Sequence, residues 1–311
     1  MRRILLDTDL AMGTPGSDID DGFALALAVA EPELRLELVT TVHGNTDVDT
    51  ATRLSHELLD RLDRDDVPVI RGAGTPLFGA RPGSGRAAPG RARTQHAAEA
   101  LVEHVMASPG EVTVVAIGPL TNLAIALLLE PELARAVDEV VVMGGVFERH
   151  TNLAAMPGEF NIWSDPDAAA LVLAGGCPLR FVGLDVTRQV RLTRRHAAAL
   201  QAAGGDFAAF AGECTTGWID HHGQTNPGEP LEQDSCALHD PLAVAAVSHP
   251  DLVTWRPAFL QVERSAAVTR GVMVADFLTS NEPPEPNCRV ATAVDADRFI
   301  GLFQQRIGSL R

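Results

Sequence analysis

Short apolar strands alternate with helical segments along most of this 311-residue chain, and this alternation constrains the fold more than any other feature. The runs typical of buried strands are Ile4–Leu6, Leu36–Val42, Val67–Ile70, Val112–Ile117, Val140–Met143 and Leu179–Val182. Helical patterns lie between them, at Phe23–Ala30 and at residues 48–62, 95–107, 120–129 and 165–174. This order predicts an α/β fold with a mostly parallel central sheet and helices on both faces.

The last third of the chain departs from this order. Beyond residue 193 the pattern becomes more helical, and strand-like runs return at Ala258–Glu263, Gly271–Phe277 and Arg289–Val294. The segment Phe78–Arg93 is rich in Gly, Pro and Arg, which favours a surface loop, and both its flanks keep the α/β order, which argues against a linker. The chain shows no internal repeat. We therefore expect residues 1–311 to form a single domain.

Composition narrows the classes of function. A net charge of -16 repels phosphate groups, so neither nucleic acid nor an anionic membrane is an expected partner. The absence of lysine excludes a Walker A loop and a Schiff-base mechanism. Four scattered cysteines without a CxxC pair argue against a zinc ribbon or a disulfide scaffold. Without a signal peptide or an apolar run of membrane-spanning length, we expect a cytoplasmic enzyme or binding protein.

A group of aspartates surrounds the end of the first strand. Asp7 and Asp9 follow that strand, and Asp20 and Asp21 open the next helix. Acidic residues are ordinary in the first turn of a helix, but adjacent helical positions point about 100° apart, so one cap does not explain both. Several carboxylates in one place repel each other unless a cation or a shared proton intervenes. Oxygen ligands of this kind prefer Ca²⁺ or Mg²⁺, and spacing alone leaves the metal and the helix-cap interpretations equally supported.

Three further patterns have both a structural and a functional interpretation. Asp240, between His239 and a proline, is typical of a helix N-cap, unless this helix start faces the aspartates. Glu159 and Asn161 are two residues apart and could hold vicinal hydroxyls, or they are solvated loop residues before a helix capped by Asp165. The turn that follows Ile117 needs no function, although its backbone carbonyl could ligate a hard cation.

Taken in order, these pieces resemble the inosine–uridine preferring nucleoside hydrolase family, and the similarity covers nearly the whole chain. The segments that carry it are LLDTD, DIDDGFALALA, TTVHGN, VAIGPLTNLAIAL, VVMGG, GEFNIWSDPDAA, GLDVT, ALHDPLAV and RGVMVADF. The resemblance implies a Rossmann-like α/β domain that assembles as a homodimer or homotetramer. It also implies an enzyme of nucleoside catabolism that hydrolyses the N-glycosidic bond of ribonucleosides to ribose and free base.

The resemblance assigns roles to individual residues. It implies that Ca²⁺ is held by oxygen ligands from Asp9, Asp21, Asp240 and the backbone carbonyl of Ile117. It implies that the ribose is bound, or the attacking water oriented, by Asp20, Asn45, Asn152, Glu159 and Asn161. The Ca²⁺-positioned water would be the nucleophile, with Asp9 as its base, and His239 would give a proton to the departing base.

The chain departs from the family pattern at several places. The segment Leu10–Ile19 separates Asp9 from Asp20 by ten residues where about three are usual, and it makes Asp18 a rival metal ligand. The loop at residues 79–94 lacks the usual histidine, and His96 is the nearest one. Arg188 stands after GLDVT, where histidine is usual. The aromatic residues available for either stacking on a base or core packing are Phe147, Trp163, Phe207 and Trp218.

These departures keep two other functions open. One is a hydrolase that acts on a modified nucleoside or another N-riboside. The other is a ribose-binding protein without catalytic activity on the same scaffold.

Overall fold

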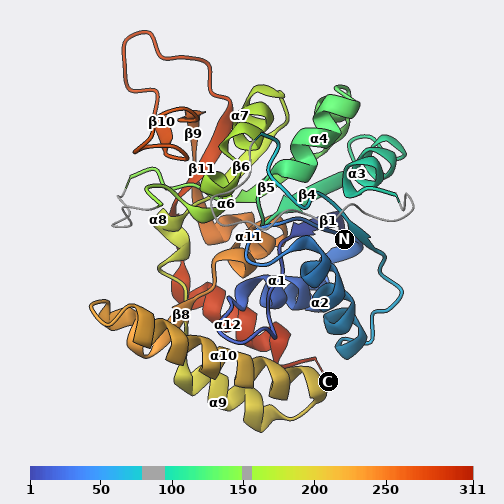
Figure 1. The fold of residues 1–311 in the computed structure, drawn as a ribbon, viewed down its shortest axis with the longest axis vertical. Coiled ribbons are helices and arrows are strands. Elements are labelled where there is room, and N and C mark those ends of the chain that lie inside the picture. Colours follow the sequence, from blue (N-terminus) through green and yellow to red (C-terminus); the bar gives the residue numbers. More distant parts are fainter. Residues whose placement is uncertain (79–94, 149–155, 311) are drawn as a thin grey trace.

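Figure 1 shows the protein as a computed structural model that describes residues 1–78, 95–148 and 156–310. Among these residues a nine-stranded sheet forms the centre. From one edge to the other its strands are β10 (Met273–Asp276), β9 (Val253–Val262), β11 (Cys288–Val294), β6 (Leu179–Val182), β5 (Glu139–Met143), β4 (Val112–Ala116), β1 (Arg2–Thr8), β2 (Leu34–Thr41) and β3 (Val69–Arg71). All neighbours from β11 to β3 pair in parallel, and β9 is antiparallel to both β11 and β10. The predicted mostly parallel sheet is confirmed.

Helices cover both faces of this sheet because successive residues of a strand project to opposite sides. Leu6 and Val115 belong to one apolar cluster, whereas their neighbours Leu5 and Val114 belong to another. The helices on the first face are α1 (Asp20–Ala30), α2 (Val48–Arg61), α11 (His239–Ser248) and α12 (Ala296–Ile307). Those on the second face are α3 (Ala97–Met106), α4 (Thr121–Leu129), α5 (Leu133–Ala136) and α7 (Pro166–Ala174). Strands buried on both faces must be apolar throughout, which is why they are easy to recognise in the sequence.

The strand order decides where a ligand can bind. Six strands follow one another as β3-β2-β1-β4-β5-β6, which is the order of a Rossmann sheet and confirms that prediction. The order reverses between β1 and β4, so the connections that leave these two strands run in opposite directions and a crevice opens at their carboxyl ends.

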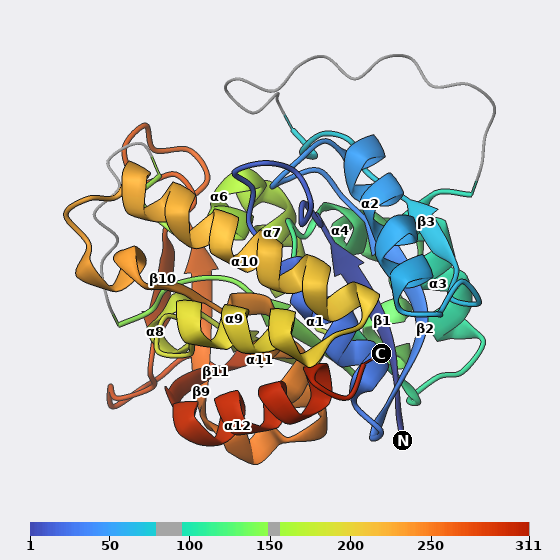
Figure 2. The ribbon, with the colours of Figure 1, turned by 90° about the horizontal axis from the view of Figure 1, so that it is seen from below.

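Residues 191–237 add an outer layer to the first face. A small antiparallel pair, β7 (Arg191–Thr193) and β8 (Ser235–Ala237), frames α9 (Arg194–Ala203), α10 (Asp206–Thr225) and the 3-10 helix η1 (Pro230–Gln233). In Figure 2, α9 and α10 run side by side across this face. Phe207 of α10 packs edge-on against Phe23 of α1, which fixes the outer layer to the core.

The remaining elements are short: α6 (Phe160–Ser164), α8 (Leu184–Thr187) and the 3-10 helix η2 (Pro250–Leu252). Element ends shift from the predicted ones by a few residues. The largest shift is at β9, which begins at Val253 rather than 258 because its first half is only partly buried. The loop predicted at Phe78–Arg93 lies, except for Phe78, outside the described residues. Within the described parts of the chain, no helix has the length and apolar character that crossing a membrane requires.

Candidate functional site

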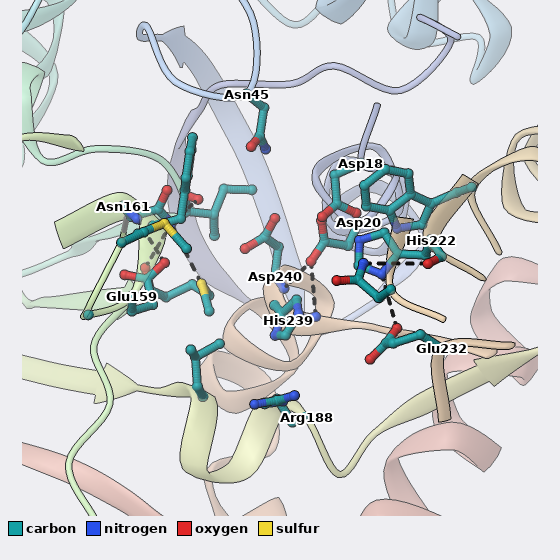
Figure 3. A pocket seen from close by; sticks show the side chains of 18 of the residues that line it. Asp18, Asp20, Asn45, Glu159, Asn161, Arg188, His222, Glu232, His239 and Asp240 are labelled. Carbon is teal, nitrogen blue, oxygen red and sulfur yellow. Dashed lines mark hydrogen bonds and ion pairs between the residues drawn. The ribbon is translucent and has the colours of Figure 1, made fainter. Parts of the chain in front are cut away.

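A cavity of about 440 Å³ lies at the carboxyl ends of the strands, where the strand order reverses (Figure 3). Seven of the residues predicted for the site line it: Asp20, Asn45, Ile117, Glu159, Asn161, His239 and Asp240. Asp9 and Asp21 are fully buried beside this lining, and both bond to Asn45. Asn152 lies outside the described residues. The fold therefore brings residues together that are more than 200 positions apart in the sequence.

Three aspartates form a compact acidic cluster beside the cavity. Asp20, Asp21 and Asp240 each offer a carboxylate oxygen within 4.8 Å of the others. Burial raises the pKa of Asp20 and Asp240 well above the usual range, and neighbouring aspartates raise both further. Burial also raises the pKa of Asp21 to about 6, although the hydroxyl of Thr8 donates to it and opposes the rise. These carboxyl groups resist ionisation unless positive charge is placed among them.

Asp9 has one oxygen satisfied and one free. Its Oδ2 accepts a hydrogen bond from the backbone N–H of Asn45 at 2.6 Å, and the Asn45 side chain donates to Asp21 at 2.9 Å. Asp9 Oδ1 is buried and has no hydrogen-bond partner in the described protein. Burial, and then the charge of Asp21, raise the pKa of Asp9 well above its usual value. The backbone reaches Asp9 this closely because residue 44 is glycine: a Cβ there would clash with Oδ2.

Asp20, not Asp240, caps helix α11. The N-cap interpretation of Asp240 is wrong, because Asp240 lies inside α11. The helix begins at His239, and its N-cap is Leu238. Asp20 Oδ2 instead accepts hydrogen bonds from the backbone N–H groups of His239 at 3.0 Å and Asp240 at 3.3 Å. A carboxylate from a distant helix therefore satisfies these N–H groups, and Asp240 can point its own carboxyl group toward Asp20 and Asp21.

Glu159 and Asn161 form the opposite wall of the cavity (Figure 3). Glu159 caps α6 and accepts hydrogen bonds from the backbone N–H groups of Asn161, Ile162 and Gly145. Burial raises the pKa of Glu159. The Asn161 amide donates to the carbonyl of Ile117 at 2.8 Å. Both polar side chains of this wall are therefore held by hydrogen bonds to the backbone, Glu159 mainly to the start of α6 and Asn161 to the segment that follows β4.

His239 lies between the acidic cluster and the outer layer. Its Nδ1 is 2.7 Å from the hydroxyl of Thr187 at the end of α8. Burial lowers the pKa of His239 to about 4, although the charge of Asp18 opposes the change. The imidazole is therefore neutral at physiological pH. When the Thr187 hydroxyl donates to Nδ1, the ring proton lies on Nε2, which can then donate a hydrogen bond.

The wall beyond His239 comes from the outer layer, and of its residues only Trp218 was considered from the sequence, as a side chain that could stack on a base. Trp218 and His222 from α10, Glu229 and Glu232 line the cavity there. Trp218 and His222 are four positions apart on one helix, which places them on the same face, and this spacing was the signal available in the sequence. Arg188, which follows α8, also borders the cavity.

The segment Leu10–Ile19 packs against the outer layer. Gly13 and Gly16 have positive φ angles of 104° and 72°, which shape the turn. A Cβ on Gly13 would lie 3.2 Å from the ring of Phe210, and one on Gly16 would lie 3.2 Å from His221 Nδ1, so the segment contacts α10 directly. Asp18, at its end, lines the cavity beside Asp20. The longer segment therefore joins the acidic cluster to α10.

Other side chains considered from the sequence lie elsewhere. His96 caps α3 and accepts a hydrogen bond from the N–H of Ala98. Of the four aromatic residues considered for base stacking, Trp218 alone lines the cavity. The other three lie in ring contacts away from it: Phe207 with Phe23, Phe147 with Phe181, and Trp163 with Phe160. Phe160 itself borders the cavity.

The chain is similar in sequence and in fold to known proteins of one family. Residues 4–301 match the model of the family described as inosine-uridine preferring nucleoside hydrolase. The chain is 32% identical to the pyrimidine-specific ribonucleoside hydrolase RihA of Citrobacter koseri, over 98% of this chain and 97% of that protein. It is 35% identical to the probable uridine nucleosidase 2 of Oryza sativa subsp. japonica, over 84% of this chain and 78% of that protein. A purine-preferring ribonucleoside hydrolase from Gardnerella vaginalis has a similar structure, with a TM-score of 0.86, 30% identity and 99% of both chains covered.

Proposed function

The chain belongs to the inosine–uridine preferring nucleoside hydrolase family, and we propose that it hydrolyses the N-glycosidic bond of ribonucleosides to ribose and free base. The observation that carries this proposal is the cavity at the strand-order reversal. It combines a buried acidic cluster with Glu159 and Asn161 on one side and His239 on the other. N-glycosidic cleavage develops positive charge on the sugar and negative charge on the base. It therefore needs carboxylates near the sugar and a hydrogen-bond or proton donor near the base.

The oxygen atoms gathered at the site are the kind of ligand that a hard divalent cation prefers. Every side chain of the acidic cluster offers carboxylate oxygen, and the partnerless Oδ1 of Asp9 adds a buried oxygen that a cation would satisfy. We propose Ca²⁺ as this cation, held by Asp9, Asp21, Asp240 and the carbonyl of Ile117. When bound, Ca²⁺ would position a water molecule and lower its pKa.

Side chains of the protein take the other roles in the reaction. Asp9 is the base that takes the proton of the attacking water. Asn45, which bonds to both Asp9 and Asp21, orients that water. The residues that bind the ribose hydroxyls are Asp20, Asn152, Glu159 and Asn161. His239 donates a hydrogen bond from Nε2 to the departing base, with Thr187 holding its ring.

Replacement of Asp9 tests this mechanism. Purified protein with Ca²⁺ should release ribose from uridine or inosine, measured as reducing sugar, and Asp9→Ala should lower kcat by about 10³-fold or more. Asp60→Asn, on the exposed side of α2, is the matched control and should keep full activity. Unchanged turnover of the Asp9→Ala protein would contradict the mechanism.

The position of Asp18 favours a second candidate substrate. This carboxyl group lines the cavity at the end of the longer Leu10–Ile19 segment, so it can contact a group that common nucleosides lack. The second candidate is therefore a modified nucleoside or another N-riboside. A panel of purine, pyrimidine and modified nucleosides separates the two, because a modified substrate would be cleaved when uridine and inosine are not. Binding of every nucleoside without ribose release would instead indicate a ribose-binding protein.

We also propose that the chain forms one domain and works as a cytoplasmic homodimer or homotetramer. The domain proposal is supported by the central sheet, which takes strands from both ends of the sequence. Light scattering of the purified protein would measure the oligomeric state.

A further inference from the structure

The cavity has a second histidine, on the side away from the ribose-binding residues. In Figure 3, Glu159 and Asn161 lie on one side, Asp240 and His239 lie in the middle, and His222 lies beyond them with Glu232. If the proposed function holds, a nucleoside whose sugar reaches Glu159 and Asn161 directs its base toward His222. The inference below rests on that function.

A chain of charged groups holds His222. Its Nδ1 is 3.1 Å from Glu232 Oε2. The guanidinium of Arg191 in β7 donates two hydrogen bonds to the same carboxylate, one to Oε1 at 3.1 Å and one to Oε2 at 3.0 Å. The Trp218 ring packs on the imidazole with its centroid 4.2 Å away. The orientation of the ring is therefore fixed from two directions.

His222 is the most exposed member of this chain. The side chains of Arg191 and Glu232 are 14% and 13% exposed, whereas that of His222 is 31% exposed. Burial opposes ionisation of Glu232, but hydrogen bonds from His222 and Arg191 prevail and lower its pKa to about 2. Glu232 is therefore a carboxylate at any physiological pH. It accepts the Nδ1 proton, which leaves Nε2 as the atom of His222 available to a ligand.

This arrangement differs from that of His239. Thr187, a neutral hydroxyl, is the partner of His239 Nδ1, whereas a carboxylate is the partner of His222 Nδ1. A carboxylate stabilises the positive charge of an imidazolium, and a histidine oriented by a carboxylate is a common unit of acid–base catalysis.

We infer that His222 is a second catalytic residue, which protonates the departing base, and that Glu232 is its positioning residue. As water attacks C1′, the bond from C1′ to the base nitrogen breaks and its electron pair stays on the base. The proton on His222 Nε2 moves to a nitrogen or oxygen of the base, while Asp9 takes one proton from the water. Solvent then returns a proton to His222 and removes the one on Asp9, so that one water molecule is consumed overall.

Substrates with different leaving groups test this role. p-Nitrophenyl riboside releases a phenolate that is stable without protonation, whereas uridine and inosine release bases that need a proton. His222→Gln should lower kcat for the nucleosides by about 100-fold and change kcat for p-nitrophenyl riboside by less than about 3-fold. Activity on the riboside also shows that the variant is folded. The matched control is His56→Gln on the exposed side of α2, which does not line the cavity and should leave both activities unchanged.

Two variants of Glu232 test the positioning role. Glu232→Gln should reproduce the loss of kcat for nucleosides with little change in KM, because the Trp218 contact and the shape of the cavity remain. Glu232→Asp keeps the charge and should restore most of the loss. Equal effects of His222→Gln on nucleosides and on the riboside, or none on either, would overturn the inference while leaving the proposed function intact. Failure of the unaltered protein to cleave any of these substrates would refute the proposed function itself.

Discussion

Asp240 is a buried carboxyl group whose pKa is affected by four other aspartates. Burial raises its pKa first, and the charges of Asp20, Asp21 and Asp9 raise it further. The unfolded chain holds each of these groups at its ordinary pKa, so the folded protein without a cation loses stability as the pH rises through that ordinary value. At the scale of single residues, the site is therefore expected to be unstable on its own and suited to bind positive charge.

Asp240→Asn tests this conclusion. With a chelator present, the variant should be more stable than the unaltered protein at about pH 8, by about 1 kcal/mol, because one charge leaves a repulsive cluster. The difference should shrink toward about pH 4, where the aspartate is protonated in the folded state and about half protonated in the unfolded state. Thermal unfolding across this pH range measures it. At each pH the quantity of interest is the stability of the variant minus that of the unaltered protein. A smaller difference at pH 8 than at pH 4 would contradict the prediction.

At the scale of helices and strands, one buried carboxylate connects three helices far from the site. Glu31, just after α1, has a side chain that is 1% exposed. It accepts hydrogen bonds from Arg306 of α12 at 2.9 Å and from His249 at the end of α11 at 3.3 Å. These contacts lower the pKa of Glu31 against the effect of burial. Because α1 and α11 both carry aspartates of the site at their other ends, this contact helps to set their relative position.

Arg306→Gln should therefore destabilise the protein. The substitution removes the charged partner of a buried carboxylate, and we expect the free energy of unfolding to fall by about 1–3 kcal/mol in urea denaturation. Arg298→Gln on the same helix is the matched control. Its ion pair with Asp251 is exposed on both sides, at 47% and 67%, so its loss should change stability by less than about 0.5 kcal/mol. Equal effects of the two substitutions would show that burial of the pair does not matter.

At the scale of the whole molecule, the proposed cation joins segments that are distant in the sequence. Asp9 follows β1, Asp21 belongs to α1 and Asp240 belongs to α11, so a cation held by all three joins the first elements of the chain to a helix more than 200 residues later. The unfolded chain cannot present these oxygens together, and the free energy of binding therefore adds to the free energy of folding.

Ca²⁺ should raise the stability of the whole fold for this reason. At a concentration 100 times its Kd, Ca²⁺ should add about 2.7 kcal/mol to the free energy of unfolding. Differential scanning calorimetry with Ca²⁺, with Mg²⁺ and with a chelator measures this effect and compares the two ions. Asp240→Asn serves as the control, since it lacks a proposed ligand and should show a much smaller rise in Tm. An equal rise in both proteins would place the ion somewhere else.

Much of the architecture was predictable because its signals are local. Strands buried on both faces must be apolar, so β4, β5 and β6 are visible as short runs of valine, leucine and phenylalanine. The polar residues at the ends of strands stand out against these runs, which is how Asp9 was identified as a candidate, whereas the family resemblance assigned roles to Asn45 and Ile117.

The sequence by itself determined the alternating α/β pattern, the family resemblance and seven of the residues that line the cavity. Tertiary structure alone decided which carboxylate caps α11, since the local sequence suggested Asp240 and the actual cap, Asp20, lies 219 residues away from His239 in the sequence. It also decided that His222, Glu232 and Arg191 form one hydrogen-bonded chain at the cavity. Hydrogen bonds between distant segments depend on how the elements pack, and the local pattern of residues does not record that packing.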